Sequence, residues 1–133
     1  MKIGFVGLGN VGGKLAGSLL RNNFDLTVRD LDKNLTKIFT DSGAKIASSA
    51  KKLAEEVDLI ITCLPSPQIC AEVMEGADGI IEGLSQNKIW LEMSTTDEAE
   101  VKRLGKKVED KKATPLDGPV SGGCHRAASG NIA

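Results

Sequence analysis

The chain has 133 residues, of which 41% are hydrophobic and 26% charged, proportions typical of a globular domain rather than a disordered segment. Seventeen basic residues stand against eighteen acidic ones, and this net charge of −1 argues against a surface for nucleic acids or anionic membranes. No apolar run approaches the roughly 18 residues that a membrane-spanning helix needs, so we expect neither nucleic acid nor membrane as a partner.

Cysteine usage and the position of the first strand bear on the compartment. Cys63, Cys70 and Cys124 contain no C-x-x-C pair, which predicts reduced thiols and neither a disulfide framework nor a metal site. The first predicted strand begins at residue 2 and leaves no room for a signal or transit peptide. We therefore expect a cytoplasmic protein.

The first 22 residues predict a strand, a glycine-rich turn and a helix. An apolar run from Ile3 to Val6 predicts the strand, and helical spacing of apolar residues predicts a helix over 10–22. Between them lies the G-x-G-x-x-G segment Gly7, Leu8, Gly9, Asn10, Val11, Gly12. Gly7 would make the tight turn, Gly9 would let the backbone approach a pyrophosphate, and Gly12 would let the helix lie close to the strand. The pyrophosphate would lie at the helix N-terminus, whereas the alternative is a merely structural turn.

A second strand, carrying Leu26 and Val28, ends at Asp30, about 20 residues after the glycines. A carboxylate in this position accepts hydrogen bonds from the adenosine ribose hydroxyls and repels a 2′-phosphate, so it favours NAD over NADP. Arg29 and Lys33 keep NADP open as the alternative, since either side chain could neutralise a phosphate. Asp30 could also be no more than a helix-entry residue.

The rest of the chain alternates between helix and strand. Further strands are expected at residues 44–47, 58–64, 88–92 and 114–117. Helices are expected after Asp32, after Ser48 or Ser49, at 67–75, and after a capping box formed by Thr95 and Glu98. This alternation predicts an α/β fold, a Rossmann-type doubly wound parallel sheet with helices on both faces.

Ligands of such sheets bind outside the carboxyl ends of the strands. Leu64 and Pro65 follow the fourth strand and Thr95 follows the fifth, so topology places them on the cofactor's side, although a strand terminator and a helix cap are the simpler interpretations. After the sixth strand, Ser121-Gly122-Gly123 offers N–H groups beside a hydroxyl, which suits a carboxylate but also an ordinary loop. His125 has no visible carboxylate partner, so we expect a solvent-facing loop histidine.

Together these segments resemble the β-hydroxyacid dehydrogenase family (3-hydroxyisobutyrate dehydrogenase-like) over the whole chain. The resemblance rests on residues 3–12, on Leu64-Pro65, on Ser94-Thr95-Thr96 and most specifically on residues 117–123, Asp-Gly-Pro-Val-Ser-Gly-Gly. It implies that a nicotinamide dinucleotide is held by Gly7, Leu8, Gly9, Asn10, Val11, Gly12, Asp30, Leu64, Pro65 and Thr95. It also implies that Ser121, Gly122 and Gly123 bind the carboxylate of a small 3-hydroxy acid or semialdehyde.

The resemblance further implies a division into domains. Residues 1–133 would form the NAD(P)-binding domain, incomplete at its C-terminal edge, and the family's catalytic lysine lies in a C-terminal helical domain that this chain lacks. We therefore expect no catalytic residue in this chain, no turnover by the chain alone, and a homo-oligomeric full-length form. The alternative is a non-catalytic dinucleotide-binding or interaction module; a domain for another adenosine cofactor is disfavoured because the Ser121 motif would then have no purpose.

Overall fold

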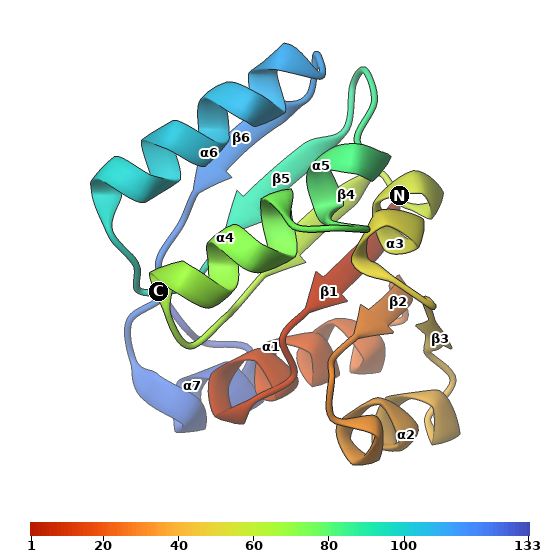
Figure 1. The fold of residues 1–133 in the computed structure, drawn as a ribbon. Coiled ribbons are helices and arrows are strands. Elements are labelled where there is room, and N and C mark those ends of the chain that lie inside the picture. The colour runs from red at the N-terminus through yellow and green to blue at the C-terminus, as the bar shows by residue number, and fades with distance from the viewer.

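A computed structural model describes all of residues 1–133 and contains one six-stranded sheet (Figure 1). The strands are β1 (Lys2–Val6), β2 (Asp25–Arg29), β3 (Lys45–Ile46), β4 (Leu59–Thr62), β5 (Ile89–Glu92) and β6 (Thr114–Asp117). They are all parallel, in the order β3-β2-β1-β4-β5-β6. Ile3 of β1 lies opposite Leu26 of β2 and Leu59 of β4, and the winding direction reverses between β1 and β4. The predicted doubly wound Rossmann-type fold is confirmed.

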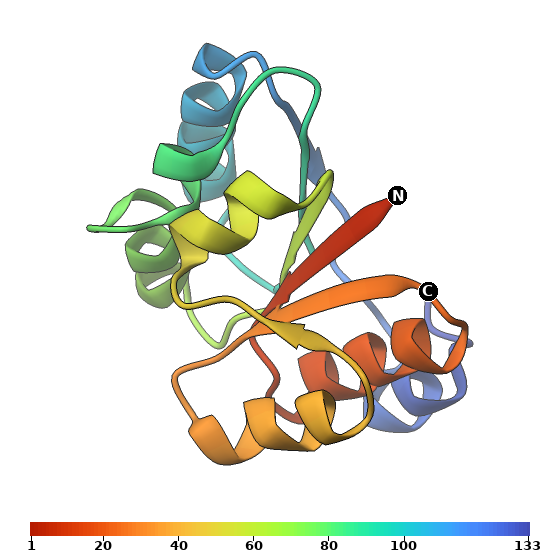
Figure 2. The same cartoon turned by 90° about the vertical axis from the view of Figure 1, so that its right-hand side faces the viewer.

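Helices cover both faces of the sheet, as the turned view shows (Figure 2). One face carries α1 (Asn10–Arg21), α2 (Lys33–Asp41) and α7 (Gly123–Ser129), and the other carries α3 (Ala50–Glu56), α4 (Pro67–Glu75), α5 (Ile80–Gly83) and α6 (Glu98–Asp110). Each face has its own apolar core: Ile60 of β4 packs into the core beneath α3 to α6, and its neighbour Ile61 packs into the core beneath α1. This alternation follows from the two-residue period of a strand. None of the helices is long and apolar enough to cross a membrane.

Helix starts follow local side-chain chemistry. The Asp32 side chain accepts a hydrogen bond from the Asn34 N–H at 2.9 Å, and the Ser49 hydroxyl accepts one from the Lys52 N–H at 3.1 Å. Ser49, and not Ser48, is therefore the cap of α3. The helix predicted at 67–75 has those bounds in the structure, with Pro67 in its first turn.

The structure corrects the sequence-based prediction at three places. The capping box of Thr95 and Glu98 is wrong: α6 begins at Glu98 itself, and the Asp97 side chain caps it by accepting from the Ala99 N–H at 3.1 Å. The short helix α5 was not predicted. His125 is exposed as expected, yet it lies in helix α7 and not in a loop. Helix α7 buries only Ala127, so it has no apolar periodicity by which sequence could reveal it.

Candidate functional site

The loop between β1 and α1 is built on two glycines that no larger residue could replace without movement. Gly7 has a φ of +98°, and a Cβ there would lie 2.2 Å from the Cys63 carbonyl oxygen. A Cβ on Gly12 would lie 2.0 Å from the carbonyl oxygen of Gly7. Both obstacles are backbone atoms, so the turn, the start of α1 and the end of β4 pack together only because these side chains are absent.

Gly9 has the opposite environment, because a Cβ added there would meet nothing within 4 Å. Gly9 is also the N-cap of α1, with no side chain capping the helix and no acidic residue in the first turn. The first hydrogen bond of the helix runs from the Gly13 N–H to the Gly9 carbonyl oxygen at 2.8 Å, so the N–H groups of Asn10, Val11 and Gly12 have no partner within the helix. An open backbone, unpaired donors and a positive helix end fit a pyrophosphate.

Asp30, directly after β2, connects the glycine loop to the next segment of chain. Its Oδ2 accepts a hydrogen bond from the Leu8 N–H at 2.7 Å, and its Oδ1 accepts one from the Asp32 N–H at 2.8 Å. A carboxylate has about four lone-pair positions, so both oxygens retain capacity for a ribose hydroxyl. The sequence did not reveal this bracing role, because Leu8 and Asp30 meet only when β1 pairs with β2.

A hollow of about 440 Å³ lies beside Asp30. It is lined by Arg29, Asp30, Leu31, Lys33, Thr36, Lys37, Thr40 and Ile46. Lys37 pairs with Asp41 at 2.7 Å, whereas Arg29 and Lys33 form no ion pair in the structure. The hollow therefore combines one carboxylate with two unpaired cations, which leaves both a ribose hydroxyl and a ribose phosphate chemically acceptable.

The loops after β4 and β5 are joined by a partly buried hydrogen bond, and a buried one holds the second loop to the end of β5. The Leu64 N–H donates to Ser94 Oγ at 2.7 Å, and the Ser94 N–H donates to Glu92 Oε1 at 2.7 Å. Pro65 and Thr95 in the same loops are exposed at the edge where the glycine loop lies. Sequence reasoning named Ser94 only as part of the segment Ser94-Thr95-Thr96 and did not single out Glu92, although a glutamate ending an otherwise apolar strand was a usable signal.

Two thiols near these loops stay protonated at neutral pH. Burial, and secondarily the charge of Glu92, raise the pKa of Cys63 to about 11. The pKa of Cys70 is raised further, first by burial and then by the charge of Glu92. Neither thiol is a nucleophile in this state, because the thiolate is the reactive form.

The segment Ser121-Gly122-Gly123 leaves the sheet after β6 and is exposed. The Ser121 N–H donates to the Ala133 carbonyl oxygen, and the Ala133 N–H donates back to Ser121 at 3.1 Å. Gly122 and Gly123 have φ values of 120° and 69°, which favour glycine. The Ser121 hydroxyl and the N–H groups of the two glycines thus remain for a ligand, but the Ser121 N–H does not.

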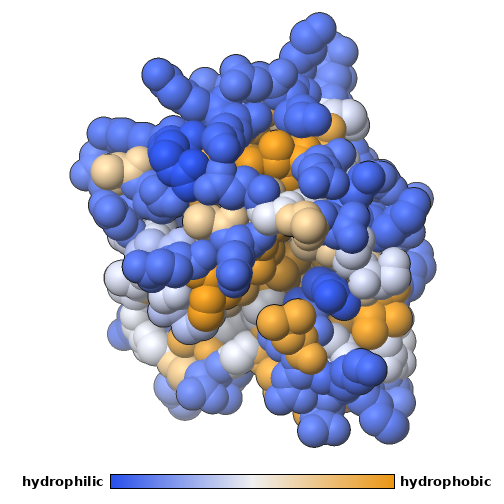
Figure 3. Space-filling view, viewed as in Figure 1, coloured by the Kyte–Doolittle hydropathy of each residue, from blue (hydrophilic) through white to orange (hydrophobic).

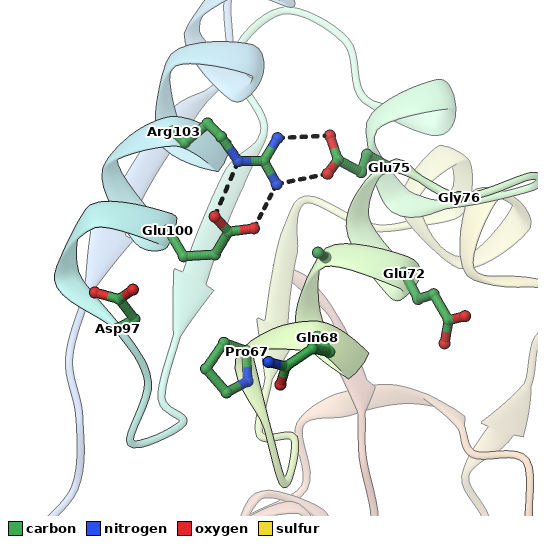
Figure 4. Close-up of a pocket in the computed structure, with 9 residues that line it drawn as sticks. Pro67, Gln68, Glu72, Glu75, Gly76, Asp97, Glu100 and Arg103 are labelled. Carbon is green, nitrogen blue, oxygen red and sulfur yellow. Dashed lines mark hydrogen bonds and ion pairs between the residues drawn. The ribbon is translucent and has the colours of Figure 1, made fainter.

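A second hollow, of about 700 Å³, lies between α4 and α6 and contains none of the predicted site residues. Arg103 holds Glu75 on one side and Glu100 on the other, as Figure 4 shows. The face that carries this groove is largely hydrophilic, with hydrophobic side chains gathered toward its middle (Figure 3).

No group of three or more potential metal ligands occurs in the structure.

Comparison with known proteins identifies the family of the chain. The family described as the NAD binding domain of 6-phosphogluconate dehydrogenase matches residues 2–133. The chain is 39% identical over 130 residues to mitochondrial 3-hydroxyisobutyrate dehydrogenase of Mus musculus, a match that covers 98% of this chain and 39% of that protein. It is 32% identical to L-threonate dehydrogenase of Cupriavidus necator, with 98% of this chain and 44% of the relative covered.

Solved structures agree with the sequence relatives. The chain superposes on the crystal structure of 3-hydroxyisobutyrate dehydrogenase from Salmonella typhimurium with a TM-score of 0.91 at 27% identity, covering 99% of this chain and 46% of that one. The chain therefore spans less than half the length of these relatives. Because the family match covers all but the first residue, the chain belongs to the family of the NAD binding domain of 6-phosphogluconate dehydrogenase, with 3-hydroxyisobutyrate dehydrogenases among its relatives.

Proposed function

We propose that this chain is the cofactor-binding half of an oxidoreductase that transfers hydride between a nicotinamide dinucleotide and a small 3-hydroxy acid or semialdehyde. The observation that carries the proposal is the uncapped N-terminus of α1, open above Gly9 and flanked by Asp30. The names of the relatives, which are 3-hydroxyisobutyrate and L-threonate dehydrogenases, support the substrate class.

In this proposal the carboxyl ends of the strands hold the cofactor. Residues Gly7 to Gly12 bind the pyrophosphate through backbone N–H groups, and Asp30 binds the adenosine ribose. Leu64 and Pro65 offer an apolar surface to the nicotinamide half, and Thr95 offers a hydroxyl. When bound, the dinucleotide supplies the hydride donor or acceptor at its nicotinamide ring. The protein's contribution is orientation and exclusion of water.

NAD is the proposed cofactor, with NADP as the alternative. The Asp30 carboxylate would lie close to a 2′-phosphate and repel it. Arg29 and Lys33 support the alternative, because both line the hollow beside Asp30 and neither is paired. One structure with the same fold, 22% identical, was solved in complex with NADP⁺, and another, 14% identical, in complex with NAD⁺.

The substrate would bind at Ser121, Gly122 and Gly123, with its carboxylate on the serine hydroxyl and the glycine N–H groups. Proton transfer would come from a lysine in a helical domain outside residues 1–133, so we propose no turnover by this chain alone. A homo-oligomeric whole protein in the cytoplasm completes the proposal, although the compartment is open because several relatives are named as mitochondrial.

Calorimetric titration of the chain with NADH and, separately, NADPH tests the cofactor proposal. Tighter binding of NADH supports the proposal that Asp30 binds the adenosine ribose. Tighter binding of NADPH supports the alternative, in which Arg29 and Lys33 bind the 2′-phosphate. Absence of binding to either by a folded chain contradicts the proposal. The alternative of a non-catalytic module is tested on the whole protein, which on our proposal oxidises a 3-hydroxy acid with NAD.

The matched variant is Gly9→Ala. Its Cβ meets no protein atom within 4 Å, so we expect unchanged thermal stability. The methyl group would, however, enter the space in which we propose that the pyrophosphate binds. We expect at least a tenfold loss of NADH affinity, equivalent to about 1.4 kcal/mol. Gly105→Ala, on α6, is the control, because its Cβ makes only ordinary 3.6 Å contacts with Pro115 of β6. Unchanged binding in Gly9→Ala would remove the glycine loop from the site.

A further inference from the structure

The carboxylate of Glu92 is buried at the point where β5 ends. Glu92 is 0% exposed, and its strand lies between β4 and β6 in the interior of the sheet. A buried carboxylate is unfavourable unless hydrogen-bond donors replace the water it loses. Its two oxygens have separate donors: Oε1 accepts from the Ser94 N–H, and Oε2 accepts from the Cys70 thiol at 2.7 Å.

The thiol of Cys70 anchors this carboxylate to helix α4. Burial and the charge of Glu92 raise the pKa of Cys70, so the sulfur keeps its proton and acts as the donor. Cys70 is itself 1% exposed and belongs to the core beneath α3 to α6. One oxygen of Glu92 is therefore held by Cys70 of helix α4, and the other holds the loop after β5 through Ser94.

The hydrogen bonds continue from Glu92 to the loop after β4. The N–H group of Ser94 donates to Glu92, and the hydroxyl oxygen of Ser94 accepts a hydrogen bond from the Leu64 N–H at 2.7 Å. Leu64 also packs against the glycine turn, since its Cδ2 is 3.0 Å from the position of a Cβ on Gly7. Glu92 is thus connected through Ser94 both to Leu64 and, in the next residue, to Thr95.

These loops lie on the opposite side of the glycine turn from Asp30. The sheet order places β2, with Asp30, on one side of β1, and β4 and β5 on the other. If the adenosine ribose binds at Asp30 and the pyrophosphate binds at α1, the nicotinamide half extends over the loops after β4 and β5.

We propose that Glu92 is a positioning residue, which acts through Ser94 to hold Leu64 and Thr95 in place for the nicotinamide half of the dinucleotide. This inference rests on the proposed function of the same site. It predicts a selective defect: loss of the Glu92–Ser94–Leu64 connection weakens binding of the whole dinucleotide and spares a ligand that occupies only the adenosine half.

The structure offers a matched control two residues earlier on the same strands. The Trp90 Nε1–H donates to Thr62 Oγ1 at 2.9 Å, and both residues are fully buried. This bond also joins β5 to β4, but it connects side chains within the sheet and holds neither loop. Thr62→Val should therefore lower the melting temperature without changing affinity for either ligand.

The experiment compares NADH and ADP as ligands of the wild-type chain, Ser94→Ala, Glu92→Gln and Thr62→Val, by calorimetry or ligand-observed NMR. Loss of one hydrogen bond in Ser94→Ala should weaken NADH binding by about threefold to tenfold and leave ADP binding unchanged. Hydrogen exchange of the Leu64 amide should accelerate in the same variant. If Glu92→Gln fails to fold, Ser94→Ala still tests the connection between the two loops, because it removes the hydroxyl that accepts the Leu64 N–H and leaves the carboxylate and Cys70 intact.

The outcomes separate the two proposals. A wild-type chain that binds ADP but neither NADH nor NADPH more tightly overturns the proposed function, and the role of Glu92 with it. A wild-type chain that binds NADH, with Ser94→Ala binding it equally well, overturns only the inference about Glu92. Equal losses of NADH and ADP affinity in Ser94→Ala, matched by Thr62→Val, also overturn it, because the effect would then be one of stability.

Discussion

The two edges of the sheet differ in whether their polar backbone groups have hydrogen-bond partners within the protein. At the amino ends, the Lys88 ammonium group donates to the carbonyl oxygens of Ala54, Glu55 and Val57, the latter two at 2.8 Å, and so closes the end of α3. At the carboxyl ends, the first N–H groups of α1 have no partner in the helix, and Gly9 leaves open space beside them. One edge satisfies its groups internally, while the other keeps donors for a ligand.

The carboxyl edge is not uniformly open, however. Beneath its surface, Asp30 holds Leu8, and Glu92 holds Ser94, through carboxylate oxygens that accept backbone N–H groups. The exposed donors are therefore carried by loops that two carboxylates fix in place, the partly buried Asp30 and the fully buried Glu92. On the proposed function, the contacts of Asp30 and Glu92 hold the loops of the cofactor site, whereas the contacts of Lys88 stabilise the fold alone.

The largest expected effect on stability and binding follows from adding a side chain where Gly12 packs against the Gly7 carbonyl oxygen, at the carboxyl edge. In Gly12→Ala the Cβ would lie 2.0 Å from the Gly7 carbonyl oxygen, so the loop must move. We expect the free energy of unfolding to fall by about 1–3 kcal/mol, as for other overpacked sites, and NADH binding to be lost. Urea unfolding and calorimetry measure the two effects.

Gly17→Ala in the same helix is the control. Its Cβ would meet only the end of the flexible Arg21 side chain, at 3.3 Å. Because alanine favours the helix, we expect a gain of up to about 1 kcal/mol and no change in affinity. If the Gly12→Ala chain were as stable as this control, the close contact between Gly12 and the Gly7 carbonyl oxygen would be contradicted.

An intermediate effect is expected at the amino edge from Lys88→Met. Burial lowers the pKa of Lys88, and three carbonyl oxygens accept hydrogen bonds from its ammonium group. Loss of these bonds should lower the free energy of unfolding by about 0.5–1.5 kcal/mol, less than in Gly12→Ala. Affinity for NADH should not change, and the exposed Lys106→Met variant should match the wild type in both measurements. Weaker NADH binding without a loss of stability in Lys88→Met would contradict the division between the two edges.

The smallest effect is expected away from both edges, in the groove between α4 and α6. Hydrogen bonds from Arg103 and then Lys107 lower the pKa of Glu75 from 4.5 to about 2. Since the folded state favours the charged carboxylate, its contribution is complete above pH 4.5 and is lost as the pH falls toward 2. Partly exposed ion pairs contribute about 0–1 kcal/mol, so the effect is small.

The measurement is urea unfolding of the wild type and Glu75→Gln across this pH range. The stability difference between them should shrink on acidification, with NADH affinity at neutral pH equal in both. Glu72→Gln, one turn earlier on α4 and without an ion pair, is the control. A difference that grows as the pH falls would have the wrong sign for this network.

Local patterns predicted most of the helices and all six strands. The apolar periods of α1 and β4 lie within single elements, and the caps Asp32 and Ser49 act within three residues of their helices. The prediction failed at the start of α6, where Asp97 competed with Thr95, and at α7, whose contact with the core is the single residue Ala127. The first failure is a choice between neighbouring cap residues, and the second is a helix without apolar periodicity; the four-residue helix α5 was missed as well.

For the candidate site, the sequence by itself determined which residues lie at the carboxyl ends of the strands, because glycine spacing and strand periodicity are local properties. Only the tertiary structure decided how those residues support one another. The Leu64 and Ser94 bond joins residues 30 positions apart and exists because β4 pairs with β5, just as Asp30 reaches Leu8 because β1 pairs with β2. Hydrogen bonds between loops depend on which strands become neighbours, and the packing of the whole sheet determines that order.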